Sequence, residues 1–131
     1  MPLPEQLDEK SFAFENLLGI DQWSSFTVSA SITVVGTPTY TGRYKIVGKL
    51  CFFQISAVAS TSIATTAGTS YFALPITAKG LAGSATMTND TTDVAVGVCH
   101  VDVAASRVYP PSQAASGNTF TLAGWFEIGG T

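Results

Sequence analysis

His100 is the only histidine of the chain, and Asp102 follows it at a distance of two residues. In a β-strand both side chains would point to the same face, and the chain has many serines that could complete a hydrolase triad. However, no Gly-x-Ser-x-Gly sequence occurs, and His100 stands between Cys99 and Val101 in an apolar run. A histidine in such a run is more often a satisfied interior or interface residue. We therefore expect no catalytic residue here.

The spacing of candidate metal ligands gives no support to a metal site. Cys51 and Cys99 are far apart in the sequence, and the single histidine has no second ligand at a typical spacing. Asn89, Asp90 and Asp93 are close enough to gather around a calcium ion, but such residues more often shape a turn. No glycine-rich phosphate loop occurs. We predict no metal and no cofactor.

Glycan chemistry divides into cleavage and binding. Cleavage needs two carboxylates in one cleft, and nothing brings together the four acids that follow residue 30. Binding needs aromatic rings as stacking surfaces, and rings at strand ends more often pack locally or fill interfaces. The sequence therefore favours a non-enzymatic protein, with glycan binding as an alternative. The candidates for glycan contact are Tyr40, Tyr44, Tyr109 and Trp125.

The charge content excludes several classes of partner. Charged residues make up 11% of the chain, against about 25% in a typical soluble domain. The six basic residues form no cluster, so we expect no nucleic-acid binding.

No stretch approaches the roughly 20 apolar residues of a membrane helix, so we expect no membrane insertion. The N-terminal sequence MPLPEQLDEK lacks the apolar core of a signal peptide, which predicts synthesis in the cytoplasm without export.

Cys51 and Cys99 each lie within an apolar run. Buried thiols in a protein made in a reducing cytosol usually stay free, which is the reading that we favour. Spacing alone does not show proximity, so a disulfide between them remains an alternative.

Apolar and polar residues alternate with a period of two from Phe26 onward, which is typical of strands. Many Thr, Gly and Ser residues suit strands and turns. The sequence predicts an all-β, antiparallel β-sandwich or jelly roll of about seven to eight strands, with one domain over residues 26–131. The principal predicted strands cover 26–34, 44–58, 70–74, 80–88, 94–103 and 119–128, while 61–68 is a link or short strand and 110–118 a loop.

Residues 1–25 form a predicted N-terminal arm. Five of the nine acids of the chain lie in this arm, with one base, Lys10. The arm is too apolar for a free tail, so it either packs on its own domain or docks on a neighbouring protein. The docking candidates are Phe12, Phe14, Leu17, Leu18 and Ile20.

Two predicted strand segments, 50–55 and 94–103, are apolar on both faces. Such strands need cover on both faces, and a sandwich of this size buries only one face of each sheet. We expect a neighbouring copy to cover the second face, most simply in a homo-oligomer. The candidate interface residues are Phe53, Ile55, Val96 and Val98.

Residues 37–128 resemble the jelly-roll domains of tailed-bacteriophage fibre and head-decoration (cement) proteins. The resemblance is carried by 39–44 (TYTGRY), 45–55 (KIVGKLCFFQI), 71–75 (YFALP), 107–111 (RVYPP) and 117–127 (GNTFTLAGWFE). It implies a homotrimeric β-knob on the virion surface that decorates or braces the capsid, or forms a short appendage. It also implies capsid or tail proteins as partners of the arm. The alternative that it implies is a tail-fibre knob that recognises host surface glycan.

Overall fold

The computed structural model describes residues 23–80 and 82–128. These residues form strands and loops with no helix, and every strand pair is antiparallel, as expected for the all-β class. No helix in this described part is long and apolar enough to cross a membrane. The strands are β1 Ser24–Phe26, β2 Ala30–Ser31, β3 Thr33–Val35, β4 Thr39–Val47, β5 Leu50–Val58, β6 Ser62–Thr65, β7 Tyr71–Ala73, β8 Gly83–Asn89, β9 Val94–Asp102, β10 Arg107–Tyr109, β11 Gln113–Ser116 and β12 Thr119–Glu127.

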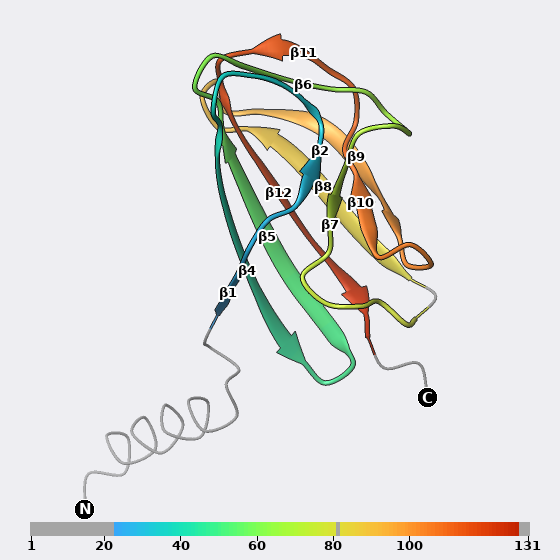
Figure 1. Ribbon diagram of the computed structural model, residues 1–131. Helices are drawn as coiled ribbons and strands as arrows, with labels where there is room; N and C mark the ends of the chain where they lie inside the picture. Colours follow the sequence, from blue (N-terminus) through green and yellow to red (C-terminus); the bar gives the residue numbers. More distant parts are fainter. Residues whose placement is uncertain (1–22, 81, 129–131) are drawn as a thin grey trace, which may run out of the picture.

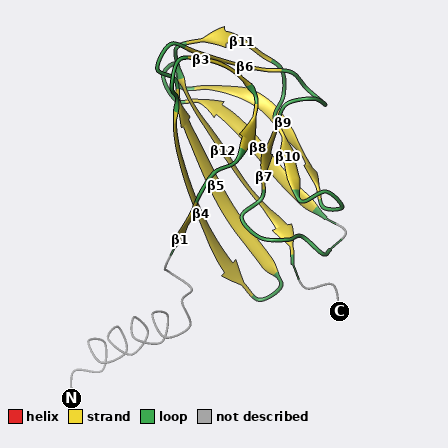
Figure 2. Ribbon diagram, in the orientation of Figure 1, coloured by secondary structure: helices red, strands yellow, loops and turns green. Residues whose placement is uncertain are grey.

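The strands form two sheets. A nine-stranded sheet has the order β1-β4-β5-β12-β8-β9-β10-β7-β2, and a three-stranded sheet has the order β11-β6-β3. The small sheet lies across one end of the long strands, at the top of Figures 1 and 2. The strands of the large sheet follow one another around a curled, half-barrel surface.

The connection between β1 and β2 shows how strongly the large sheet curls. These strands lie at opposite edges of the sheet, yet only residues 27–29 separate them. Four steps of chain span at most about 14 Å, so the two edges lie near each other. Ring contact across the interior agrees, because Tyr40 of β4 and Phe72 of β7 lie with centroids 6.3 Å apart.

The concave side of the curled sheet holds the hydrophobic core. Alternation along β5 and β12 sends every second residue inward, and Phe53 and Phe126 meet there with ring centroids 5.9 Å apart. The predicted inward face of β12 is confirmed at Phe120, Leu122 and Phe126. The largest buried side chains also include Phe72, Ile55, Ile63, Met87 and Val108.

The prediction that Phe53 and Ile55 lie at a subunit interface is wrong, because both side chains point into the core. Phe53 and Ile55 are 1% and 0% exposed on the inner side of β5, and a side chain buried within one chain cannot contact a second one. The outer face of that segment carries Phe52 and Gln54 instead. Val96 is half-buried against the core, whereas Val98 is 74% exposed.

Several predicted strand boundaries also change. The stretch 44–58 is not one bent strand, because a tight turn at Gly48 and Lys49 reverses the chain and pairs Val47 with Leu50. Gly48 has φ +61°, which glycine adopts without strain. The stretch 26–34 is divided among β1, β2 and β3, because the chain crosses from one sheet edge to the other and then enters the small sheet. The expected loop 110–118 contains β11.

Candidate functional site

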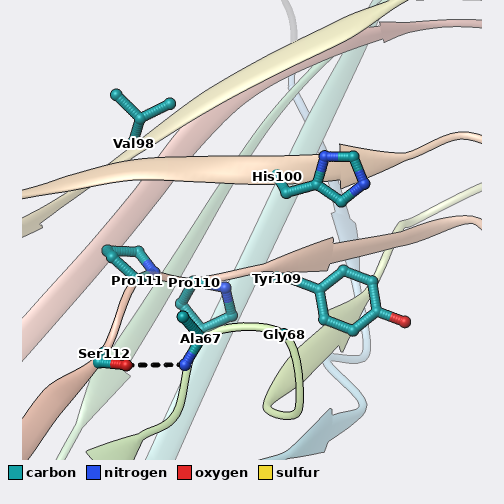
Figure 3. Close-up of a pocket in the computed structure, with 8 residues that line it drawn as sticks. All are labelled: Ala67, Gly68, Val98, His100, Tyr109, Pro110, Pro111 and Ser112. Carbon is teal, nitrogen blue, oxygen red and sulfur yellow. Dashed lines mark hydrogen bonds between the residues drawn. The ribbon is translucent and has the colours of Figure 1, made fainter.

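A cleft of about 510 Å³ opens on the outer side of β9 and β10. The chain between β6 and β7 forms its other wall (Figure 3). Its lining is mainly apolar, with one imidazole, one phenol and one hydroxyl group. The lining residues are Ala67, Gly68, Val98, His100, Tyr109, Pro110, Pro111 and Ser112.

Antiparallel pairing sets a row of rings beside this cleft. His100 of β9 lies opposite Tyr109 of β10, and their rings stack with centroids 6.0 Å apart and planes 26° apart. The ring of Tyr71 of β7 also contacts Tyr109, with centroids 5.9 Å apart in an edge-to-face arrangement. The guanidinium of Arg107 lies 3.9 Å from the centroid of the Tyr71 ring. A hydrogen bond with the Tyr109 side chain raises the pKa of Arg107 above its usual value.

Hydrogen bonds hold the loop wall in place. The N–H of Ala67 donates to the hydroxyl of Ser112 at 2.8 Å, as drawn in Figure 3. The hydroxyl of Thr65 donates to the carbonyl oxygen of Pro111 at 2.6 Å. Within the loop, the N–H of Ser70 donates to the carbonyl oxygen of Thr66 at 2.9 Å. The cleft is therefore bounded on both sides by backbone with fixed partners.

Asp102, two residues after His100 on β9, has a hydrogen-bond partner in the turn that follows the strand. Its carboxylate accepts a hydrogen bond from the N–H of Ala105 at 3.1 Å, and its neighbour across the sheet is Arg107. Among the described residues, no three His, Cys, Asp or Glu side chains gather as metal ligands would. The geometry of the cleft suits binding through ring surfaces and an apolar wall.

The side chains of the Asn89–Asp93 segment shape the turn between β8 and β9. The amide oxygen of Asn89 accepts hydrogen bonds from the N–H groups of Thr91 and Thr92, at 3.1 and 3.2 Å. The carboxylate of Asp90 accepts hydrogen bonds from the hydroxyls of Thr88 and Thr121. These oxygens serve local turn geometry, which was the reading that the sequence favoured over a calcium site.

Cys51 and Cys99 are free thiols buried in the core, so the expected free state is confirmed. Burial raises the pKa of Cys51 to about 11 and that of Cys99 to about 12. The reactive form of cysteine is the thiolate, which these pKa values suppress at neutral pH. Both side chains act as small apolar core residues.

The four candidates for glycan contact are not brought together. Tyr40 and Tyr44 lie partly buried against the core, where Tyr44 packs on Phe26 with centroids 6.1 Å apart. Tyr109 lines the cleft, and Trp125 lies on a separate part of the outer face. Of these four residues, only Tyr109 lines the cleft of about 510 Å³. The candidate docking residues 12–20 lie outside the described residues.

A second outer surface, which we call the tryptophan surface, surrounds a hollow of about 310 Å³ that is lined by Trp23 and by residues of β5 and β12. Arg43 and Lys45 lie over the ring of Trp23, at 4.7 and 5.8 Å from its centroid. This surface was not predicted from the sequence, because Trp23 was assigned to the arm and Phe53, rather than Phe52, was predicted to lie at an interface. Its residues are Trp23, Arg43, Lys45, Phe52, Gln54, Ala123 and Trp125.

Comparison of the chain with protein-family models, with curated proteins and with solved structures gives no match.

Proposed function

We propose that this chain is a non-enzymatic structural protein of a bacteriophage virion, which associates with copies of itself on the particle surface. In this proposal it forms a homotrimeric β-knob that decorates or braces the capsid, or forms a short appendage. Its partners are its own copies and capsid or tail proteins. The trimer and the virion come from the resemblance of residues 37–128 to phage jelly-roll domains, with which a curled antiparallel sheet is compatible.

The exposure of Val98 is the observation that carries the self-association. This side chain is 74% exposed in the middle of a long strand, at the rim of the 510 Å³ cleft. Val58, on the outer face of β5, is also 42% exposed. Exposed apolar side chains on an ordered sheet favour a protein partner, because burying them contributes about 25 cal/mol per Å².

A second candidate function is recognition of a host surface glycan at the cleft. The row of His100, Tyr109 and Tyr71 supports it, because aromatic rings give apolar surfaces for the C–H faces of a sugar. Binding to an array of bacterial surface glycans, lost in Tyr109→Ala, would establish this candidate. Binding that survives Tyr109→Ala would place the glycan elsewhere.

Mass spectrometry of purified particles tests the virion assignment. Particles should be collected from the host that makes this chain and washed at high salt, and a low-resolution particle map should then locate added density. We expect the chain in stoichiometric amounts on the outer surface. Its absence from intact particles, with abundant soluble protein in the same lysate, would contradict the proposal.

A further inference from the structure

The tryptophan surface has the composition of a docking site. Trp23 and Phe52 are 37% and 36% exposed, and together with Trp125 they border a hollow of about 310 Å³. Such a hollow is large enough for one apolar side chain of the size of Leu or Phe. Cross-strand pairing sets Lys45, Phe52 and Trp125 in one row over β4, β5 and β12. The row therefore combines rings with positive charge at one side.

The charge of this surface is opposite to that of the N-terminal segment. Arg43 and Lys45 lie over Trp23, and Arg43 also donates to the amide oxygen of Gln54 at 2.7 Å. Residues 1–22 contain five acids and one base, together with the apolar side chains of 12–20. The segment thus carries both the negative charge and the apolar side chains that this surface would attract.

Trp23 lies where the N-terminal segment meets the tryptophan surface. Trp23 lines the hollow, so the segment 1–22 joins the described structure at the tryptophan surface itself. A tethered segment has an effective concentration near its site in the millimolar range. Nine residues span about 14 Å as a helix or about 30 Å as a strand, and the three strands are only about 10 Å across. Either conformation of 12–20 could cover them.

We propose that residues 12–20 dock on the tryptophan surface of the same chain, with an apolar side chain in the hollow and the acids beside Arg43 and Lys45. This inference goes beyond the proposed function, because it concerns contact within one chain rather than between copies. Of the two alternatives for the N-terminal arm, this proposal favours packing on the domain of the same chain over docking on a neighbouring protein. A second copy as the source of the segment is the competing outcome of the test.

Tryptophan fluorescence of the full chain reports this contact directly. The chain has two tryptophans, both on this surface, and residues 1–22 contain no Trp or Tyr. In Leu17→Asp/Leu18→Asp, acrylamide quenching should rise about twofold, toward that of a freely exposed indole. The control Ser11→Asp/Asn16→Asp adds the same charge at polar positions and should quench as the wild type does. Equal quenching of both variants, with wild-type circular dichroism, would overturn the proposal.

A disulfide trap distinguishes the two sources and does not depend on the folding of the charged variant. In full-length Leu18→Cys/Gln54→Cys, mild oxidation should form a cross-link within one chain, while the buried Cys51 and Cys99 stay reduced. The control Leu18→Cys/Thr77→Cys should cross-link at least tenfold more slowly. A cross-linked dimer, or equal rates in both proteins, would overturn the proposal. The solution mass of the wild type tests self-association separately, so the two failures are distinguishable.

Discussion

β12 and β8 approach each other closely at Gly124, where an added Cβ would lie 2.1 Å from the carbonyl oxygen of Ser84. Because the contacted atom belongs to the backbone, an added methyl group would force β8 and β12 apart and disturb the hydrogen bonds between them. We expect Gly124→Ala to lower the free energy of unfolding by about 1–3 kcal/mol or more. Urea denaturation measures it, with Ala123→Ser on the same strand as control. A loss equal to that of the control would show that the two strands can separate at little cost.

The buried thiols give a pH dependence whose sign follows from their raised pKa values. In the unfolded chain both thiols ionise near their ordinary pKa of 9.0, whereas in the fold they stay protonated up to pKa values of about 11 and about 12. Their contribution to stability is complete below pH 9 and is lost as the pH rises toward 11 and 12. Each thiol should lower the free energy of unfolding by about 1.4 kcal/mol per pH unit in this window.

Urea denaturation between pH 8 and pH 11 measures this loss. The matched control is Cys51→Ala/Cys99→Ala, in which the free energy of unfolding should fall distinctly less steeply with pH. Parallel pH profiles of the two proteins would contradict the role of the thiols.

At the scale of elements, the amide of Asn89 stabilises the turn from β8 to β9. Asn89 is 8% exposed, and its amide oxygen accepts two backbone N–H groups. Asn89→Ala should cost about 1–2 kcal/mol, because those N–H groups lose a buried partner. Thr92→Ala changes an exposed side chain in the same turn and is the control. If both changes cost the same in thermal unfolding, the amide does not hold the turn.

The long strands were the easiest elements to predict. β9 and β12 match their predicted ranges within one residue. Alternation identifies β12, whereas β9 is identified by a short apolar run that follows a turn. The two-residue turn at Gly48 and Lys49 had a local signal, a glycine between two apolar runs. This glycine was interpreted as a possible bend within one strand over 44–58 rather than as a reversal of the chain. The short strands β2, β10 and β11 have too few residues to show a period of two. They are defined by their pairing with other strands.

The candidate sites were also hard to predict, because they depend on which strands pair. Val98 is exposed as expected, whereas Phe53 and Ile55 are buried, because an apolar run does not itself tell which residue faces the core. Tyr109 and His100 become neighbours only through the pairing of β9 with β10. The tryptophan surface requires residues from β4, β5 and β12, which no local pattern brings together.

At the scale of the whole molecule, Val98→Lys tests where copies meet. The side chain is 74% exposed, so a lysine there should leave the fold intact and place a charge in an apolar interface. We expect the association constant to fall at least tenfold, measured by analytical ultracentrifugation. Thr77→Lys adds the same charge in an exposed loop and should associate as the wild type does. Equal association of the two variants would move the interface away from β9.

Self-association is the central claim, and the mass of the wild-type full chain in solution tests it most directly. Light scattering behind gel filtration, over a range of micromolar concentrations, should give about three times the chain mass of 13.6 kDa. A value of 13.6 kDa at every concentration would contradict the account, because the exposed Val98 would then lack the partner copy that explains it.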